Sequence, residues 1–333
     1  MKPGRRSRAL PTKDVPPVSD LCPGCDSPEA RTLFCATDRL YRTTDKYFRV
    51  VQCGNCGLIR LFPQPSPDEL RQYYPQDYWF AARPSTAERL EQMYRRLVLR
   101  DHVSFVRSAL RDSGEQGVVL DVGCGGGLFL RMLKEFGFRV AGLDVSLEAA
   151  GIAWRDNSVP VVCATLSKAP LLRESCSAIT MFHVLEHLSE PVSYLETARE
   201  LLRPNGRLIV QVPNAVCWQF RFFGGKWNGV DVPRHLINFR QRDLENLLHH
   251  CGFEVLRCKH FSLRDNPAGF ASSVAPWLDP MARRVRRTGE SPRQKLVKDL
   301  VYFGLVVAAV PFTLLEAACR AGSTIMVEAR KKS

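Results

Sequence analysis

The first twenty residues contain no apolar core, so the sequence predicts no cleaved secretion signal. We therefore expect a reducing compartment, which argues against disulfides among the twelve cysteines. No internal repeat is visible, which argues against a solenoid or a propeller. The charge-free run Leu300–Leu315 spans about 24 Å as a helix, whereas a hydrocarbon core is about 30 Å thick, and Pro311 interrupts the run. These features exclude a simple transmembrane helix.

Acidic residues are also few relative to basic ones: the sequence has 34 Asp and Glu and 47 Lys and Arg. The resulting formal net charge of +13 favours an anionic partner, which is a phosphorylated substrate, nucleic acid or an acidic membrane surface. The charge does not choose among the three. The hydrophobic share of 45% is ordinary for a globular protein, and 333 residues suffice for one sizeable domain with a small accessory one.

From about residue 101 the chain alternates between β-rich and helix-like segments. Strands are expected at 118–121, 139–144, 159–163, 178–182, 207–212, 253–261 and 323–329. Helices are expected at 102–112, 128–136, 147–156, 190–202 and 241–251. This alternation predicts an α/β fold with a parallel sheet that is covered on both faces.

A glycine-rich turn follows the first of these strands. Gly123 and Gly125 match the first two glycines of the dinucleotide fingerprint G-x-G-x-x-G, but the position of the third glycine is occupied by Leu128. Asp121 precedes the turn, where a carboxylate would repel a pyrophosphate and attract a cationic ligand. Asp144 follows the second strand and can accept both hydroxyls of a ribose. The turn therefore predicts a nucleoside site that does not take a dinucleotide.

The segments DVGCGGG (121–127) and GLDVS (142–146) resemble the first two motifs of class I S-adenosylmethionine (SAM)-dependent methyltransferases. Further segments resemble the ubiquinone- and sugar-type branch in order: FHVLEHL (182–188), LRPNGR (202–207), WNGVDVPRHL (227–236) and CGF (251–253). The resemblance covers about 20–265 and the final strand. It implies a Rossmann-like fold with a seven-stranded, mostly parallel sheet, and SAM as co-substrate.

The resemblance also implies which residues contact SAM. They are Asp121, Gly123, Cys124, Gly125, Gly127, Asp144, Val145, Thr165 and His183. The pattern departs from the family at 164–166, where Ala-Thr-Leu lacks the frequent acidic residue that holds the adenine amino group. A backbone contact could replace that residue.

Three residues are predicted to serve the acceptor. Methyl transfer from a sulfonium needs mainly positioning, and a general base helps where the acceptor loses a proton. His235 is the first candidate for the base, and Arg234 for binding a phosphate or carboxylate of the acceptor. His183 is expected to contact SAM or the acceptor. A bracing role for Arg234 and His235 stays open, and Glu186 and His187 are expected to be structural.

Two CxxC pairs, Cys22 with Cys25 and Cys53 with Cys56, predict a tetrahedral four-cysteine zinc site. Such a site has no open coordination position, so the zinc is structural. The ribbon would either read nucleic acid or shape a small-molecule site, and few of its basic residues are interleaved with aromatics, which weakens the first reading. The segment CGNCGLIRLFPQP and the tyrosines that follow it resemble ribbon-bearing methyltransferases of bacterial polysaccharide and secondary-metabolite pathways. A tyrosine from 73–78 is expected to fold over the cofactor.

Residues 281–299 are rich in basic residues and run directly into the apolar run 300–315. If 323–329 is the last strand of the sheet, a single membrane crossing by 300–315 would place this strand on the opposite side of the membrane from the rest of the sheet. We expect an interfacial or re-entrant helix whose cations meet lipid phosphates. These cations are Arg283, Arg284, Arg286, Arg287, Arg293 and Lys295. The alternative is an apolar helix packed on the domain or in a dimer interface.

Together these features predict a cytoplasmic enzyme, peripheral at the inner face of the membrane, that methylates a small anionic or lipid- or sugar-linked acceptor. A zinc-ribbon RNA methyltransferase and a non-catalytic SAM-binding or scaffold protein are the alternatives. The predicted segments are 1–20, a disordered basic tail; 21–62, the zinc ribbon; 63–100, a helical connector; 101–265, the SAM-binding core; 266–322, the basic and apolar insert; and 323–333, the final strand and tail.

Overall fold

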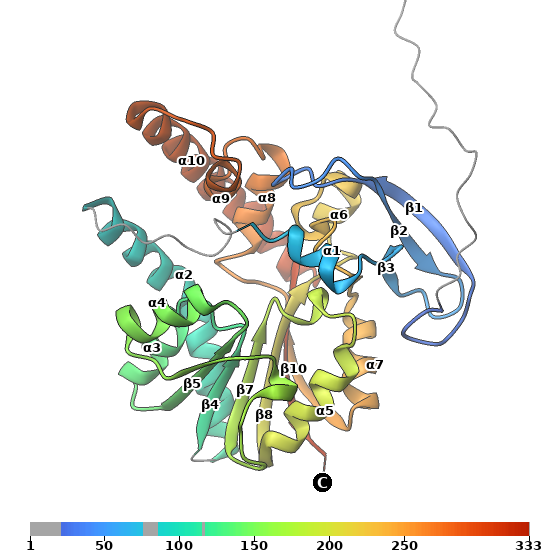
Figure 1. The fold of residues 1–333 in the computed structure, drawn as a ribbon, viewed down its shortest axis with the longest axis vertical. Coiled ribbons are helices and arrows are strands. Elements are labelled where there is room, and N and C mark those ends of the chain that lie inside the picture. The colour runs from blue at the N-terminus through green and yellow to red at the C-terminus, as the bar shows by residue number, and fades with distance from the viewer. Residues whose placement is uncertain (1–20, 76–85, 115–116, 333) are drawn as a thin grey trace, which may run out of the picture.

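The computed structural model describes residues 21–75, 86–114 and 117–332. A large α/β layer carries a small antiparallel sheet beside one end of its strands, and a helical segment lies next to that sheet (Figure 1). The predicted basic tail, 1–20, and residues 76–85 of the predicted connector lie outside the described residues.

Seven strands form the large sheet, in the order β10-β11-β8-β7-β4-β5-β6. They are β4 (Val118–Val122), β5 (Arg139–Asp144), β6 (Val161–Cys163), β7 (Cys176–Phe182), β8 (Leu202–Pro213), β10 (Phe253–Lys259) and β11 (Thr324–Lys331). Strands β4 to β8 are parallel, whereas β11 runs antiparallel to both β8 and β10. The predicted seven-stranded, mostly parallel sheet is thus confirmed. The chain order reverses at β4, which pairs with β5 on one side and β7 on the other, and ligands of such sheets bind at this switch point.

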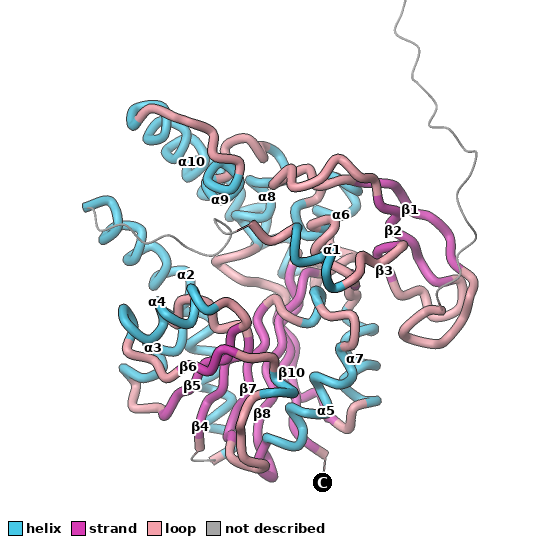
Figure 2. The backbone as a smooth tube through the Cα atoms, viewed as in Figure 1, coloured by secondary structure: helices cyan, strands magenta, loops and turns pink. Residues whose placement is uncertain are grey.

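Helices cover both faces of the sheet (Figure 2). The long helix α2 (Thr86–Ser113) lies with α3 (Leu128–Glu135) and α4 (Leu147–Asn157) on one side, and α5 (Pro191–Leu201) and α7 (Gln241–His250) lie on the other. Successive residues of β4 serve the two faces, as the period of two in a strand requires. Val119 packs in the cluster of α2 and α3, and Leu120 packs in the cluster of α5 and α7.

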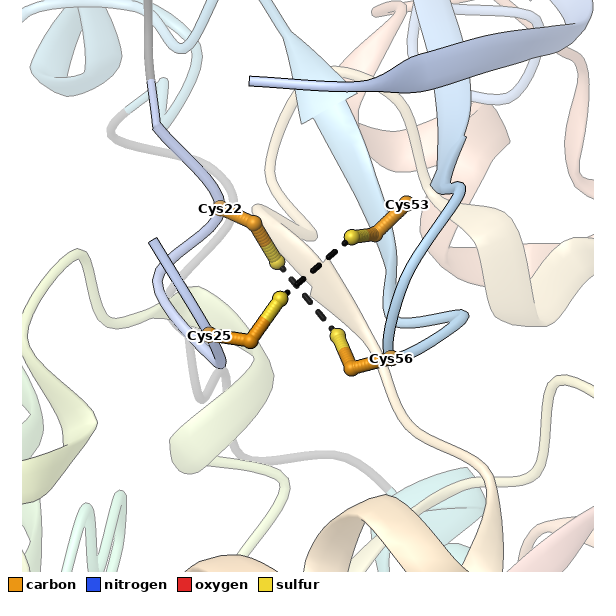
Figure 3. Close-up of side chains that lie close together, drawn as sticks. All are labelled: Cys22, Cys25, Cys53 and Cys56. Atoms are coloured by element: carbon orange, nitrogen blue, oxygen red, sulfur yellow. Dashed lines mark hydrogen bonds between the residues drawn. The ribbon is translucent and has the colours of Figure 1, made fainter. Parts of the chain in front are cut away.

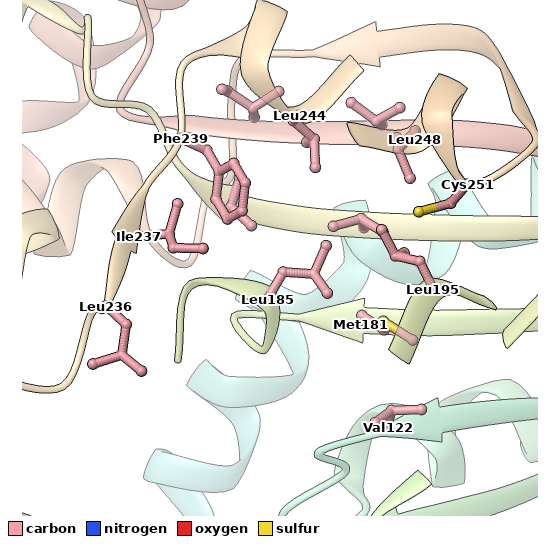
Figure 4. Close-up of a cluster of buried hydrophobic side chains, with 14 of the residues drawn as sticks. Val122, Met181, Leu185, Leu195, Leu236, Ile237, Phe239, Leu244, Leu248 and Cys251 are labelled. Atoms are coloured by element: carbon pink, nitrogen blue, oxygen red, sulfur yellow. The ribbon is translucent and has the colours of Figure 1, made fainter. Parts of the chain in front are cut away.

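The second of these clusters continues out of the sheet. Figure 4 shows Leu195 of α5 next to Met181 of β7 and Leu244 of α7 next to Phe239, with Ile237 and Leu236 at one end of the same cluster. Buried residues of the small sheet, such as Phe48 and Leu61, belong to it too. The small sheet and the large one therefore share one hydrophobic core.

The small sheet has the order β1-β2-β3-β9. Its first three strands, β1 (Ala30–Ala36), β2 (Phe48–Cys53) and β3 (Ile59–Phe62), come from the predicted ribbon. The fourth, β9 (Ile237–Asn238), comes from the loop before α7 and pairs with β3 through Ile59 and Arg60. The ribbon sheet is thus completed by a strand of the predicted core, which the sequence did not indicate.

The remaining helices flank the ribbon and the end of the chain. They are α1 (Pro67–Gln72), α6 (Trp218–Phe223), α8 (Asn266–Val274), α9 (Pro280–Val285) and α10 (Pro292–Ala318). Ser291 and Gln294 cap the start of α10 reciprocally, so this helix begins eight residues before the predicted apolar run. It also passes through Pro311, where an interruption was expected. The missing N–H costs one backbone hydrogen bond, and buried Ala309 and Thr313 pack on either side of the proline.

Candidate active site

The glycine turn between β4 and α3 adopts the conformation that its composition requires. Gly123, Gly125 and Gly127 have φ of +75°, +52° and +74°, a region that side chains rarely adopt. A Cβ on Gly127 would lie 2.9 Å from Cβ of Ala153, so glycine also allows α3 to start against α4. A Cβ on Gly125 would meet nothing within 4 Å. The turn therefore leaves open space beside its backbone at the switch point.

Asp144 closes this turn from the end of β5. Its Oδ2 accepts a hydrogen bond from Gly125 N at 2.8 Å, and its Oδ1 accepts one from Ser146 N at 2.8 Å. Burial raises the pKa of the carboxyl, and the backbone N–H groups oppose that shift. Asp144 is fixed in place at the position that the sequence assigned to ribose binding.

Asp121 lies beneath the turn and is almost fully buried. The Thr180 hydroxyl donates to its Oδ1 at 2.6 Å. Burial raises the pKa of this carboxyl to about 7; the Thr180 hydrogen bond opposes the shift, and the nearby Asp144 adds to it. Half of the molecules therefore carry the Asp121 charge near neutral pH, and a cation placed close to it would favour the ionised form.

The other residues predicted to contact SAM have different surroundings. Cys124 is buried, and a Cβ on Gly142 would come 2.5 Å from its sulfur, so the cysteine packs against β5. Val145 is exposed beside Asp144. Thr165 precedes a short 3-10 turn after β6, and its hydroxyl lies 3.5 Å from that of Ser167. All three border the carboxyl ends of β4, β5 or β6, and contact with a cofactor stays a prediction for each.

His183 follows β7 with a φ of +57°, which is unusual for a residue with a side chain. Its Nδ1 lies 3.0 Å from Oε1 of Glu186, and its Nε2 lies 2.8 Å from the Gln211 amide nitrogen and 3.5 Å from Oδ2 of Asp265. Burial lowers the pKa of the imidazole, but Asp265 and Glu186 outweigh burial and raise it to about 9. The charges of Asp265 and Glu186 therefore favour the protonated imidazole.

Arg234 does not have the surroundings that the acceptor role requires. Its side chain has no exposed surface, and Nε and Nη2 donate to Asp231 while Nη1 and Nη2 donate to Asp38. Nη1 also donates to Tyr73 O. All five N–H donors are used, so none is left for an acceptor phosphate or carboxylate. The structure corrects that prediction: Arg234 joins the ribbon to the loop before β9.

His235 does lie at the carboxyl edge of the sheet. Its Nδ1 donates to the carbonyl of Gly229 at 2.8 Å, and its ring stands edge-on to His187, with centroids 4.6 Å apart. His187 in turn lies 2.9 Å from the hydroxyl of Tyr74. Burial and the neighbouring His235 lower the pKa of His187 to about 4. His183 and His235, far apart in sequence, thus meet around Glu186 and His187.

Tyr74 is one of the tyrosines that were expected to cover the cofactor. The structure places it against the histidines, whereas Tyr73 is buried and donates to Glu69 at 2.6 Å. Tyr78 lies outside the described residues.

Asp265 is a residue of this edge that sequence reasoning missed. Ser262 and Gln211 donate to its Oδ2 at 2.6 and 2.7 Å. Burial alone would raise its pKa, but the charges of Arg264 and His183 hold it well below its usual range. Its position after the carboxyl end of β10, on the same edge as His183, was the available signal.

The two CxxC turns bring four sulfurs together (Figure 3). Sγ of Cys22 lies 3.6 Å from Sγ of Cys56, and Sγ of Cys25 lies 3.6 Å from Sγ of Cys53. A tetrahedral zinc ion with Zn–S bonds of about 2.3 Å separates its sulfurs by about 3.8 Å. The four thiols therefore fit a metal ion of this kind, and the cluster could hold one.

The sequence profile of a family described as a methyltransferase domain matches residues 90–257. The chain belongs to this methyltransferase family. The matched part holds the glycine turn, Asp144 and both predicted catalytic histidines, and leaves out β1 to β3 and α8 to α10.

Curated relatives agree with this assignment. A protein of Mycolicibacterium smegmatis named "Probable S-adenosylmethionine-dependent methyltransferase" is 30% identical over 157 residues, which are 47% of this methyltransferase and 58% of that protein. A ubiquinone biosynthesis O-methyltransferase of Glaesserella parasuis is 27% identical over 154 residues, 42% of this chain and 65% of that one. The chain thus covers about three fifths of the length of these relatives.

Among solved structures, a geranyl diphosphate C-methyltransferase from Streptomyces coelicolor superposes with a TM-score of 0.46 and 16% identity. The superposition covers 70% of this chain and 76% of that one.

Proposed function

We propose that the protein transfers the methyl group of SAM to a small acceptor that is anionic or linked to a lipid or sugar. The arrangement of Asp144 supports this most directly. Two backbone N–H groups hold its carboxylate beside a glycine turn of positive φ, at the switch point of the sheet. A carboxylate at this place can accept both ribose hydroxyls of a nucleoside.

Asp121 and the glycine turn complete the fit for SAM. The backbone near Gly125 borders open space, so a ligand can approach it closely. SAM supplies a methyl group that is already activated on a cationic sulfur, and the buried carboxylate of Asp121 beneath the turn would favour this charge. The chain's main contribution to the reaction would be to orient the two reactants.

The histidines would serve the acceptor in different ways. Both ring nitrogens of His183 already have partners in Glu186 and Gln211, so its raised pKa would supply a positive charge near an anionic acceptor. His235 donates from Nδ1 to Gly229 O, which leaves Nε2 unprotonated when the ring is neutral. His235 is therefore the better candidate for the general base. The rate of methyl transfer should fall when His235→Gln removes this group.

A direct assay tests the methyltransferase proposal. Purified protein is titrated with SAM by calorimetry, and release of S-adenosylhomocysteine is then followed with small anionic, sugar-linked and lipid-linked acceptors. Binding of SAM with release only in the presence of an acceptor is the expected result. SAM binding without release from any acceptor class would favour a binding or scaffold protein. Release driven only by RNA, with a steep loss of RNA affinity in salt, would favour the RNA alternative.

The four cysteines would hold a structural zinc ion. We expect about one zinc per chain by elemental analysis, and loss of that zinc in Cys53→Ser. A closed site of four thiolates leaves no position for a substrate, so the ion would stabilise the ribbon and not act in the reaction. Purified protein that contains no zinc, and whose stability does not change when zinc is added, would refute this assignment.

The helix α10 would lie on a lipid surface. By length and composition it could cross a membrane, and 22% of its most apolar window is buried in the protein. Its exposed side chains include Leu300, Phe303 and Val307. Its start is tied to α9 through Arg283, and its end leads into β11, which pairs with β8 and β10 in the large sheet. Because both ends are attached to one body, a surface position fits α10 better than a single crossing.

The cations predicted to meet lipid phosphates do not all face solvent. Arg283 is buried and pairs with Glu290 and Asp299, which corrects its predicted role. Arg286 donates to Arg39 O at 2.7 Å and is half-buried. Arg293 and Lys295 in the first turns of α10 are exposed and fit lipid phosphates best.

Co-sedimentation tests this placement. We expect the full chain to pellet with phosphatidylglycerol vesicles and the triple variant Leu300→Ser, Phe303→Ser, Val307→Ser to stay in the supernatant. Leu172→Ser, which changes an exposed leucine far from α10 in sequence, is the matched control and should pellet like the wild type. Equal pelleting of the triple variant would end the lipid proposal.

A further inference from the structure

His235, the proposed general base, also belongs to a cluster with Glu186 and His187, two residues that the proposed reaction does not use. Ligand atoms of Glu186, His187 and His235 all lie within 4.8 Å of one another. The two histidines come from separate loops, one after β7 and one before β9. Their meeting therefore depends on the fold and not on one local turn.

The surroundings of the Glu186 carboxylate are the first indication that this cluster binds a ligand. The residue is 1% exposed. Its Oε1 contacts Nδ1 of His183 at 3.0 Å, but Oε2 has no hydrogen-bond partner. A buried carboxylate oxygen without a partner carries a large desolvation cost, and a cation is the partner that would offset it.

Each of the two histidines has its Nδ1 beside a backbone carbonyl oxygen. Nδ1 of His235 lies 2.8 Å from the carbonyl oxygen of Gly229, and Nδ1 of His187 lies 3.1 Å from that of Arg234. A carbonyl oxygen only accepts, so in neutral His235 the proton is on Nδ1 and Nε2 keeps its lone pair. Nδ1 of His187 also lies 2.9 Å from the Tyr74 hydroxyl, and the same tautomer fits there when both oxygens accept. Metal-binding histidines in proteins are held in this way, with the second nitrogen donating to a carbonyl.

We propose that Glu186, His187 and His235 bind a divalent transition-metal ion, with further coordination positions open toward the acceptor. Two histidines and one carboxylate suit Zn²⁺, Mn²⁺ or Fe²⁺ better than Mg²⁺ or Ca²⁺, which prefer oxygen ligands. Tetrahedral ligands about 2.1 Å from one ion are about 3.4 Å apart, so a pair of these atoms would close by at most about 1.4 Å. His183 would then orient Glu186 as a positioning residue.

The ion would restrict which class of molecule can be methylated, and this step rests on the proposed methyltransferase function. An open position on such an ion takes an oxygen donor, so the acceptor would present a hydroxyl or carboxylate to it. Bound to the ion, a hydroxyl would lose its proton more readily, which would suit O-methylation. In that case His235 would act as a metal ligand and not as the general base.

Mn²⁺ is the probe that tests the site, because it prefers oxygen and nitrogen ligands and avoids the thiolates of the ribbon. The purified full chain is titrated with Mn²⁺, and free Mn²⁺ is followed by electron paramagnetic resonance. We expect about one ion bound per chain, and displacement of it by added Zn²⁺. Glu186→Gln and His187→Gln should each weaken Mn²⁺ binding by at least about tenfold, while His250→Ala on the exposed end of α7 should not change it.

Circular dichroism of each variant shows whether it is folded, and SAM calorimetry runs alongside. Wild-type protein that binds SAM but leaves the Mn²⁺ signal unchanged would overturn the metal site and leave the methyltransferase proposal standing. Mn²⁺ binding without SAM binding would overturn the methyltransferase proposal and leave the metal site standing. Folded Glu186→Gln and His187→Gln variants that bind Mn²⁺ as tightly as His250→Ala would also overturn the site.

Discussion

The two halves of the carboxyl edge of the large sheet are built in contrasting ways. On one half, Asp121, Gly125 and Asp144 come from two consecutive strand-turn units, and a short backbone hydrogen bond joins Gly125 to Asp144. On the other half, His183 and His235 meet only because loops from distant parts of the chain and the ribbon pack together. The residues of a site of the first kind lie in a local sequence motif, whereas a site of the second kind depends on packing between segments far apart in the sequence.

The largest expected effect tests the half that depends on packing. Arg234→Met should lower the free energy of unfolding by about 3–5 kcal/mol, because it leaves the buried carboxylates of Asp38 and Asp231 without their partner. Urea unfolding measures the loss, and SAM affinity of the folded variant should hardly change. Arg173→Met, at an exposed pair with Glu200, is the control and should cost under about 1 kcal/mol. Equal stabilities of the two variants would contradict the bracing role.

The next effect tests the local half. Asp144→Asn should weaken SAM binding by about 10–100-fold, since hydrogen bonds to a charged group contribute about 1.5–3 kcal/mol. Stability should change far less than in Arg234→Met. Calorimetry provides the affinity, with Asp156→Asn on the exposed face of α4 as the matched control. An affinity equal to that of the control would remove Asp144 from the cofactor site.

A smaller effect comes from pH. In the free protein the pKa of Asp121 is raised to about 7, so the share of ionised carboxylate rises about tenfold between pH 6 and pH 8. Cationic SAM should therefore bind about tenfold more tightly at pH 8 than at pH 6. Asp121→Asn should abolish that dependence while the protein stays folded. A pH dependence that survives in the variant would assign it to another group.

The smallest effect returns to the histidines. Tyr74→Phe removes the hydroxyl that contacts His187 and should lower the free energy of unfolding by about 0.5–1.5 kcal/mol. SAM binding should be unaffected, because Tyr74 belongs to the acceptor half. Tyr47→Phe, at an exposed tyrosine, is the control and should be neutral. If Tyr74→Phe weakened SAM binding instead, the two halves would be coupled.

The contrast also explains what could be predicted from the sequence. The sheet, the turn at Gly123 to Gly127 and the position of Asp144 followed from local periodicity and a strand-turn-helix motif. The ion pair of Arg234 with Asp38 joins residues 196 positions apart, and no local pattern encodes it. Asp265 was missed for a related reason, because Gln211 and His183 reach it only when β11 joins β10 to β8 in the sheet. The strand β9 has only two residues, too few for a periodic signal.

Strand β11 has one more consequence, which concerns how the molecule is made. This strand follows the other six strands of the large sheet in sequence, yet it lies between β8 and β10 and pairs with both. During synthesis the amino-terminal parts emerge first, and the sheet would keep a gap one strand wide until 324–331 have left the ribosome. Two unpaired strand edges are exposed during that interval, and such edges favour aggregation. Closure of the sheet is therefore a late step, and a chain truncated before β11 should be trapped with that gap open.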